Sequence, residues 1–316
     1  MLAARRAGSG LVDAHHHVWD LAARPQPWLD LPGHEPLRRR FAESDLRPAA
    51  AAAGVVATVV VQTVTDPAET PELLALAAAS DLVRGVVGWV DLEDQAIADR
   101  LAGLRHRPDG NLLRGIRHPV LIEPDPHWLL RPAVLRGLAA VGEAGLCYDL
   151  VLPPDVLPVA VRAAARCPGL TFVLDHLGNP GIDQRPDERW VRAVRELAAL
   201  PNTVCKLSGI LGEPPPAGRG QTIPGAGNAV PAAPPGADVA HLVPYYETVL
   251  AAFGPARLMF GSDWPVCTLT APYGTVVAAA RALTATLSQT DRAAIFSGTA
   301  RRVYQLPGTG PCAQPC

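Results

Sequence analysis

The stretch "LVDAHHHVWD", residues 11–20, places three consecutive histidines directly after a short apolar run. A run of this kind predicts a β-strand, whereas an affinity tag is longer and lies in a polar linker. Successive side chains of a strand point to opposite faces, so we expect His15 and His17 on one face and His16 on the other. The stretch therefore predicts a His-x-His pair at the end of a strand, with ordinary packing or surface exposure as the alternative.

Seven further runs rich in β-branched residues follow this one. The eight predicted strands cover residues 11–15, 55–62, 83–90, 112–117, 146–152, 170–176, 203–209 and 257–263. Helical patterns lie between most of them, and in residues 187–200 Trp190, Val191, Val194 and Leu197 share one helix face. Eight strands alternating with helices predict a single (β/α)₈ TIM barrel of the α/β class. A doubly wound sheet is the main competitor, but no glycine-rich phosphate loop follows the first strand.

The bulk composition excludes several classes of protein. The chain has 316 residues, of which 48% are hydrophobic, enough to fill the core of one large barrel. A net charge of −2 without a basic block disfavours a nucleic-acid partner. No apolar run has the length of a membrane span, and residues 1–10 are too short and polar for a signal peptide. We expect a cytoplasmic protein with a small-molecule substrate, and the sequence leaves a homo-oligomer open.

The numbers and spacing of cysteine and lysine in the chain are informative. None of the six cysteines forms a Cys-x-x-Cys pair, so we expect reduced thiols, with Cys312 and Cys316 in a flexible tail over residues 307–316. Among 28 lysines and arginines only Lys206 is a lysine. Because arginine cannot supply a titratable amine, this residue is a candidate for the functional site.

Polar side chains gather at the predicted strand ends, where TIM barrels carry their active sites. Six of the eight strand ends have such groups: His15, His17, Arg114, Arg117, Tyr148, Asp149, Asp175, His176, Lys206, Ser208, Ser262, Asp263 and Trp264. Scattered surface polarity would not concentrate in this way. The distribution predicts one functional site at the carboxyl ends of the strands.

Several motifs then resemble the amidohydrolase superfamily, in particular its lactonase branch, whose members open sugar-acid and pyrone lactones. They are "VDAHHHVWD", "LRGIRH", "YDLVL", "FVLDHLGNP", "CKLSG", "MFGSDWPV" and "IFSGTARRVYQL". They occur in order across residues 11–306, which we predict to form the barrel domain.

The resemblance implies a role for each matching residue. It implies that Asp263 takes a proton from the attacking water and that His176 is the second catalytic residue. Arg114, Arg117 and Tyr148 match residues that contact the substrate, and we add Lys206 and Trp264 to this group. Three purely structural alternatives stay open: Asp263 as a helix cap, His176 as a packed core histidine, and Lys206 paired with a carboxylate inside the barrel. Asp175 should face away from His176 and fix a loop.

The chain departs from the binuclear members of the superfamily. Strand four carries arginines, which cannot ligate a metal, and strand five has "CYDL" without a histidine. At most one divalent ion, Zn²⁺, is expected on His15, His17 and Asp263, with His176 left open as a fourth ligand, and metal-independent activity is equally open. Arg114 and Arg117 are three positions apart, so they cannot both face inward unless a β-bulge turns one of them.

These observations favour a hydrolase that opens the lactone ring of a sugar acid or a related small acid. A non-oxidative decarboxylase on the same fold is the alternative, and a scaffold protein without activity is a third hypothesis. Residues 211–238 contain 13 prolines or glycines among 28 residues. This insertion after strand seven is expected over the active-site face, either as a lid or as a disordered insertion.

Overall fold

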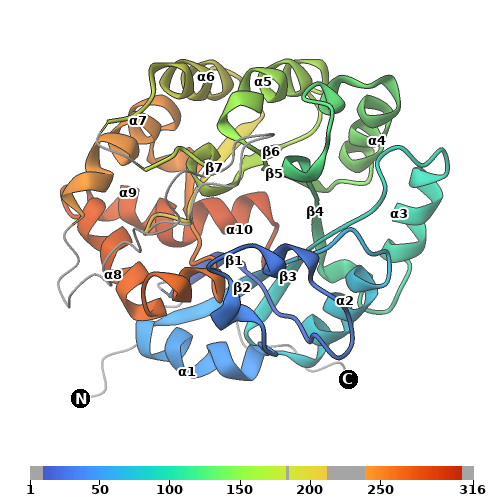
Figure 1. Ribbon diagram of the computed structural model, residues 1–316, viewed down its shortest axis with the longest axis horizontal. Coiled ribbons are helices and arrows are strands. Elements are labelled where there is room, and N and C mark those ends of the chain that lie inside the picture. Colours follow the sequence, from blue (N-terminus) through green and yellow to red (C-terminus); the bar gives the residue numbers. More distant parts are fainter. Residues whose placement is uncertain (1–9, 183–184, 212–238, 308–316) are drawn as a thin grey trace.

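A computed structural model describes residues 10–182, 185–211 and 239–307 of the chain. Eight parallel strands form one sheet in the order of the sequence, from β1 to β8, and helices surround it (Figure 1). The predicted TIM barrel is therefore confirmed. The predicted insertion and tail lie outside the described residues, apart from Leu211 and Pro307.

All eight predicted strands are present, several of them shorter than expected. Their bounds are β1 Leu11–His16, β2 Val55–Val61, β3 Val83–Gly88, β4 Leu113–Pro119, β5 Cys147–Val151, β6 Phe172–Leu174, β7 Thr203–Leu207 and β8 Leu258–Phe260. The strands β6 and β8 have three residues each. The residues that follow them leave the sheet early and are free to form the loops of the site.

Helices cover the outside of the barrel, except for the last one, whose Ala300 belongs to the apolar cluster inside it. Their bounds are α1 Glu43–Ala53, α2 Glu69–Ala79, α3 Ile97–Arg105, α4 Pro132–Glu143, α5 Leu157–Arg166, α6 Glu188–Ala198, α7 Val243–Phe253, α8 Tyr273–Leu283, α9 Gln289–Ala293 and α10 Thr299–Val303. In α6, Trp190, Val194 and Leu197 are buried as predicted, while Val191 is only half-buried. The Asp187 side chain caps this helix by accepting hydrogen bonds from the backbone N–H groups of Arg189 and Trp190.

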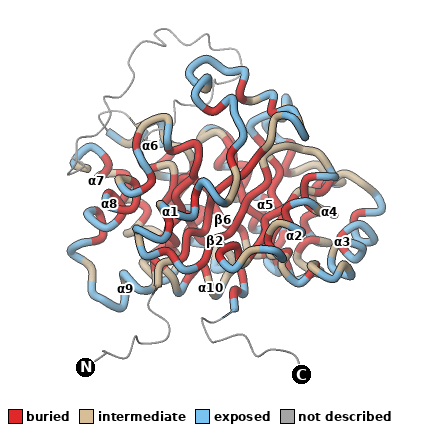
Figure 2. Tube along the Cα trace, turned by 90° about the horizontal axis from the view of Figure 1, so that it is seen from below, coloured by how far each residue is buried: buried red, intermediate tan, exposed pale blue. Residues whose placement is uncertain are grey.

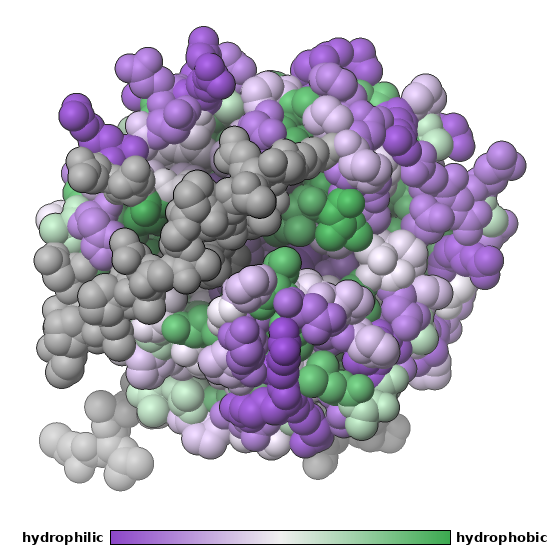
Figure 3. All heavy atoms as spheres, viewed as in Figure 1, coloured by the Kyte–Doolittle hydropathy of each residue, from purple (hydrophilic) through white to green (hydrophobic). Residues whose placement is uncertain are grey.

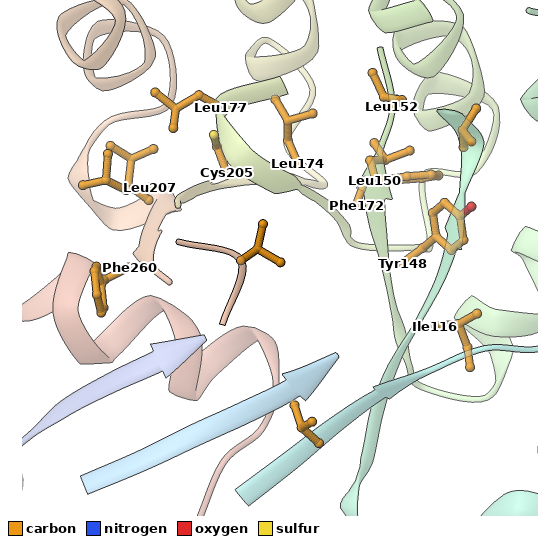
Figure 4. Close-up of a cluster of buried hydrophobic side chains, with 14 of the residues drawn as sticks. Ile116, Tyr148, Leu150, Leu152, Phe172, Leu174, Leu177, Cys205, Leu207 and Phe260 are labelled. Atoms are coloured by element: carbon orange, nitrogen blue, oxygen red, sulfur yellow. The ribbon is translucent and has the colours of Figure 1, made fainter. Parts of the chain in front are cut away.

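The barrel wall separates two apolar clusters. Outward-facing residues such as Ile116, Tyr148, Leu150 and Phe172 pack against the helices (Figure 4). Inward-facing residues form a second cluster inside the barrel: Val12, Ala14, Ala57, Val59, Val61, Val87, Cys147, Val173, Val204, Met259, Ala300, Tyr304 and Leu306. Figure 2 shows the buried strands at the centre and the exposed outer faces of the helices around them. Alternation along the strands thus divides their buried apolar side chains between the two clusters.

The barrel closes through the loop after β8. The backbone N–H of Asp263 donates to the His15 carbonyl oxygen at 2.8 Å, and the His17 N–H donates to the Trp264 carbonyl oxygen at 2.7 Å. The buried Asp13 carboxylate accepts hydrogen bonds from the Ser262 N–H at 2.8 Å, from the Ser262 hydroxyl at 2.6 Å and from the Tyr273 hydroxyl at 3.0 Å. These bonds hold the 262–264 loop beside the histidines of β1.

Helix length and the placement of apolar side chains characterise the outside of the molecule in its described residues. Within residues 10–182, 185–211 and 239–307, no helix combines the length and apolar character needed to cross a membrane. In Figure 3 hydrophilic side chains dominate the periphery of the face, and apolar side chains gather nearer its centre. Leu121 and Ile122, which follow β4, are 36% and 55% exposed.

Candidate active site

The histidine triplet lies on an irregular strand end. The register between β1 and β2 shifts between Asp13 and His16, so β1 has one extra residue there. His15 and His17 point into the barrel with their Nε2 atoms 3.1 Å apart, and the Nε2 atom of His16 lies 3.0 Å from the Thr58 hydroxyl on the other side of the wall. The predicted division of the triplet is therefore what the structure shows, and the extra residue is a β-bulge.

A layer of charged side chains lies beneath this pair. The Lys206 Nζ atom is 2.5 Å from Asp149 Oδ2, 3.0 Å from Asp175 Oδ1 and 3.0 Å from His15 Nδ1. Arg117 Nη1 lies 3.2 Å from Asp175 Oδ2. The Tyr304 hydroxyl donates to Asp149 Oδ2 at 2.8 Å, and this contact joins the layer to the apolar cluster below it. The two positive charges of Lys206 and Arg117 thus balance the two negative charges of Asp149 and Asp175 inside the barrel.

Burial and pairing shift the pKa values in this layer in opposite directions. Burial lowers the pKa of Lys206, but the carboxylates of Asp149 and Asp175 raise it above its ordinary value. Burial raises the pKa of Asp175, but Lys206, His15 and Arg117 hold it well below its ordinary value. Burial and the charge of Arg117 lower the pKa of His17 to about 3. The layer is therefore an ion-pair network beneath neutral imidazoles.

Asp263 lies over the histidine pair in a backbone conformation that L-residues rarely adopt, with φ of 59°. Its Oδ1 atom is 3.5 Å from His15 Nε2 and 3.4 Å from His17 Nε2. Gly261 makes room for this arrangement, because a Cβ atom there would lie 2.7 Å from the His15 Cβ. Asp13 and the bonds of the 262–264 loop hold the carboxylate in place.

His176 reaches the same pocket by a left-handed turn. Regular alternation in β6 directs Val173 and then Asp175 inward, so His176 would point outward if the strand continued. Instead His176 has φ of 51° and Leu177 has φ of 56°, and the His176 ring lies 4.6 Å from that of His15 between centroids. The prediction that Asp175 only fixes a loop is wrong: Asp175 and His176 both face the site, one by alternation and one by the turn.

The three atoms His15 Nε2, His17 Nε2 and Asp263 Oδ1 fit a metal ion in spacing and chemistry. Zinc bonds of 2.0–2.2 Å in a tetrahedron put neighbouring donor atoms about 3.3–3.5 Å apart, and the three separations are 3.1, 3.5 and 3.4 Å. The His17 Nδ1 atom donates to the Val61 carbonyl oxygen at 2.8 Å, which leaves the lone pair of its Nε2 directed at the site. A second group, His15, Asp175 and His176, has similar spacing, but Asp175 is already paired with two cations.

Three residues that were predicted to contact the substrate, Arg114, Tyr148 and Trp264, lie outside the group around His15 and His17. Arg114 is the extra residue of a bulge near the start of β4, and its Cγ atom would meet a Cβ on Gly85 at 3.0 Å. Because of the bulge, neither Arg114 nor Arg117 has to point to the outer face of β4. Arg114 nevertheless lies near the end of the barrel opposite the site. Tyr148 faces outward, fully buried against Phe172 (Figure 4). Trp264 is 5% exposed and packs edge-on against Phe41.

Arg117 and Lys206 are inside the barrel, and Lys206 lies deep in it. Arg117 is anchored by Gln62, whose side-chain oxygen accepts from Nε at 3.2 Å and from Nη2 at 2.9 Å. Lys206 is fully buried beneath His15, which corresponds to the alternative of a carboxylate-paired lysine. Of the predicted residues, the structure therefore gathers His15, His17, Arg117, His176, Lys206 and Asp263.

The sequence analysis placed Asp149 and Asp175 among the polar strand-end groups but gave them no role in the chemistry, and it did not select Gln62 at all. Alternation was the available signal for two of them, because Cys147, Asp149, Val173 and Asp175 occupy successive inward positions of β5 and β6. Gln62 follows the inward Val61 directly, so no pattern in the sequence marks it. A hollow adjoins His176 and is lined on its described side mainly by apolar residues, among them Leu177, Ile182 and Ile210.

A closed parallel barrel with a His-x-His pair on its first strand and an aspartate after its last strand defines a hydrolase of the amidohydrolase type. The chain matches the amidohydrolase family over residues 12–306 and belongs to this family. It is 36% identical over 307 residues to an L-fucono-1,5-lactonase of Burkholderia multivorans, covering 95% of this chain and 97% of that protein. A second L-fucono-1,5-lactonase, from Burkholderia ambifaria, is 33% identical, covering 93% and 95%.

Solved structures agree with this assignment. A crystal structure of an amidohydrolase from Burkholderia multivorans with bound zinc superposes with a TM-score of 0.83 at 35% identity, covering 95% of this chain and 100% of that one. A 5-carboxyvanillate decarboxylase from Sphingomonas paucimobilis superposes with a TM-score of 0.62 at 14% identity, covering 94% and 99%. The second likeness extends to the fold alone.

Proposed function

We propose that this chain hydrolyses the lactone ring of a sugar acid. The observation that carries the proposal is the group of His15 Nε2, His17 Nε2 and Asp263 Oδ1, three donor atoms within 3.5 Å of one another at the carboxyl ends of β1 and β8. The similarity to two L-fucono-1,5-lactonases supports a lactone as the substrate.

Asp263 is the general base in this proposal. Asp263 is 1% exposed, and its backbone N–H donates to the His15 carbonyl oxygen of β1, so a water lying against the histidine pair is within reach of its carboxylate oxygens. Proton removal by a positioned carboxylate accelerates such a step by roughly 10²–10⁴-fold. Attack of the resulting hydroxide on the ring carbonyl breaks the ring ester and releases a hydroxy acid.

Arg117 stabilises the negative charge that develops on the substrate, and His176 donates a proton to it. The Nη1 atom of Arg117 lies 3.4 Å from His15 Nε2 and therefore borders the site. Contacts with Gln62 and Asp175 fix the position of the guanidinium. A fixed guanidinium stabilises the oxyanion that forms on the carbonyl oxygen. His176, held by a contact of 2.9 Å between its Nδ1 and the Ser208 hydroxyl, is placed to return a proton to the leaving alkoxide.

A single zinc ion held by His15, His17 and Asp263 is part of the proposal. When bound, the ion would polarise the carbonyl and lower the pKa of water. The donor spacing described above and the zinc in the Burkholderia multivorans amidohydrolase support it. Decarboxylation is the weaker candidate, because its support from related structures is limited to the fold.

The test pairs lactone hydrolysis with thermal melting in an Asp263→Asn variant. The amide keeps the shape of the side chain and removes the base. If Asp263 is the base, turnover of a sugar 1,5-lactone falls by roughly 10²–10⁴-fold while the melting temperature changes little. Asp99→Asn, on the exposed face of α3, is the control and should retain full activity. A stable Asp263→Asn enzyme with a nearly normal rate would remove Asp263 from the mechanism.

A further inference from the structure

The Arg117 guanidinium directs most of its hydrogen-bond donors to one uncharged residue, Gln62. This residue is fully buried and lies directly after β2. Its side-chain oxygen accepts from Nε of Arg117 at 3.2 Å and from Nη2 at 2.9 Å, and its backbone carbonyl oxygen accepts from Nη2 at 2.5 Å. The edge of a guanidinium that carries Nε and Nη2 is one on which a carboxylate commonly binds in a bidentate manner. Here an amide oxygen occupies that edge.

The N–H groups of Arg117 that remain are on Nη1, at the border of the site. The Nη1 atom lies 3.2 Å from Asp175 Oδ2 and 3.4 Å from His15 Nε2. The second separation is long for a hydrogen bond, so the N–H on that side can turn to a substrate oxygen. Gln62 on one edge of the guanidinium and Asp175 on the other therefore fix its rotation about the Nε–Cζ bond.

The anchor at Gln62 adds no negative charge next to the guanidinium. In the described part of the chain Arg117 forms an ion pair with one carboxylate, that of Asp175, and Lys206 lies 3.0 Å from the same carboxyl group. A glutamate at position 62 would make the same hydrogen bonds but would place a second carboxylate on Arg117. Because opposite charges attract strongly in a buried site, such a pair would reduce the stabilisation that Arg117 offers to a developing oxyanion.

Neighbouring groups hold Gln62 itself in one orientation. Its side-chain N–H donates to the Val64 carbonyl oxygen at 3.4 Å, which turns the side-chain oxygen toward Arg117. The turn after β2 is bound in its place by the buried carboxylate of Glu69, the first residue of α2. This carboxylate accepts from the Thr63 N–H at 3.0 Å and from the Val64 N–H at 3.2 Å. The orientation of Gln62 is thus built into the connection between β2 and α2.

We propose that Gln62 is a positioning residue that acts through Arg117: its uncharged oxygen fixes the orientation of the guanidinium and leaves the positive charge available to the reacting carbonyl. The effect on rate rests on the proposed function, because it requires Arg117 to stabilise the oxyanion of lactone hydrolysis. The fixed orientation of the guanidinium stands without it.

The first measurement is lactone hydrolysis by the wild type, Gln62→Glu and Gln62→Met in the presence of zinc. Glutamate keeps the acceptor and adds a charge, whereas methionine keeps the length of the side chain and removes the acceptor. We expect kcat to fall at least about tenfold in both variants with KM within about threefold of the wild type, because the oxyanion forms only in the transition state. A residue with a merely structural role would tolerate glutamate, so a Gln62→Glu enzyme with the kcat of the wild type would overturn the proposal.

The variant Gln26→Glu is the matched control. Gln26 is another buried glutamine, and its side-chain oxygen accepts from the Trp28 indole N–H at 2.9 Å. It contacts none of the site residues, so the same change of charge there should leave kcat unaltered. An equal fall of kcat in the two glutamate variants would mean that any buried charge lowers the rate, and it would overturn the role of Gln62.

The second measurement does not need activity. In ¹⁵N spectra a guanidinium held in one orientation gives separate Nη1 and Nη2 signals, and rotation about the Nε–Cζ bond exchanges them. An Arg117→Lys variant assigns the signals of Arg117. We expect slow exchange in the wild type and in Gln62→Glu, and faster exchange in Gln62→Met. Exchange as slow in Gln62→Met as in the wild type would overturn the positioning role.

The outcomes separate this inference from the proposed function. A wild-type protein that opens no lactone would overturn the proposed function together with the effect of Gln62 on kcat, and the spectra would then decide the positioning role by themselves. If circular dichroism shows that Gln62→Met does not fold, the kcat of Gln62→Glu decides the matter.

Discussion

The interior of the barrel has two layers that the same strands build in opposite ways. In the lower layer, inward side chains such as Val59, Val173 and Met259 are apolar and pack against Tyr304 of the C-terminal segment. One alternation further along β6 and β7, Asp175 and Lys206 are equally buried but charged. Both layers are closed to water, so burial alone does not distinguish packing from chemistry.

The difference between the layers is how each is stabilised. Apolar groups gain from burial by about 25 cal/mol per Å² without needing specific partners. Buried charges are stable only when each is paired and hydrogen-bonded, and in the upper layer Lys206 and Arg117 are matched by Asp149 and Asp175. The upper layer is therefore the part of the core in which a single substitution changes both stability and chemistry.

The largest effect on stability is expected from Lys206→Met. This change keeps the length of the side chain but leaves Asp149 and Asp175 with one cation fewer, which should cost about 3–5 kcal/mol of unfolding free energy. Urea denaturation followed by circular dichroism measures it. The double variant Lys206→Met/Asp149→Asn should recover part of the loss, because it restores the charge balance. A single variant as stable as the wild type would show that the ion pairs of the upper layer are not coupled as described.

A pH dependence should come from His17, whose imidazole lies above the upper layer. The pKa of His17 is lowered to about 3 by burial, against 6.5 for an ordinary histidine. Below pH 6.5 the unfolded chain takes up a proton at this residue while the folded chain does not, so stability is lost as the pH falls. Between pH 6.5 and 4.5 this residue should account for about 2–3 kcal/mol in metal-free protein.

The variant His17→Asn does not titrate, so it should lose that much less stability than the wild type over the same interval. Urea denaturation of chelator-treated protein at the two pH values gives the comparison. Parallel losses in the two proteins would mean that His17 is protonated in the folded state.

A smaller effect is expected in the lower layer from Met259→Leu. This swap conserves volume, so it should cost less than about 1.5 kcal/mol. The kcat/KM for lactone hydrolysis should stay within about twofold of the wild type, because Met259 belongs to the inner apolar cluster and not to the charged layer above it. A large loss of kcat without a loss of stability would place the lower layer in the chemistry.

The smallest effect is expected from Tyr148→Phe. The sequence-based hypothesis put Tyr148 in the substrate pocket, whereas the structure directs it outward against Phe172. Removing its hydroxyl should leave the KM for the lactone unchanged and alter stability by about 1 kcal/mol or less. A KM that rises several-fold would favour the original hypothesis over the outward placement.

The fold was predictable because its signal is repeated. Eight β-branched runs and the helical patterns between them are independent observations of one architecture, and every predicted strand is present. The division of the His15–His17 pair from His16 also followed from alternation. In these places local periodicity and tertiary structure agree.

The details of the site were less predictable because they depend on departures from regular strands. The bulges of β1 and β4 add a residue that changes which side chains face inward, and only the pairing with the neighbouring strand reveals them. The left-handed turn at His176 and Leu177 brings a residue into the site that alternation would direct away from it. Conversely, Asp149 and Asp175 follow the regular pattern, yet the sequence-based hypothesis gave neither of them a role in the chemistry.

Lactone hydrolysis itself can be measured on the wild-type protein. The protein is incubated with zinc and a panel of sugar 1,4- and 1,5-lactones in a pH-stat, with a carbon dioxide sensor in the same vessel. We expect one equivalent of base to be consumed for each lactone opened, above the spontaneous rate, without release of carbon dioxide. Hydrolysis no faster than the spontaneous rate across the panel would show that the site does not open lactones, and carbon dioxide release from an aromatic acid in a parallel vessel would favour a decarboxylase instead.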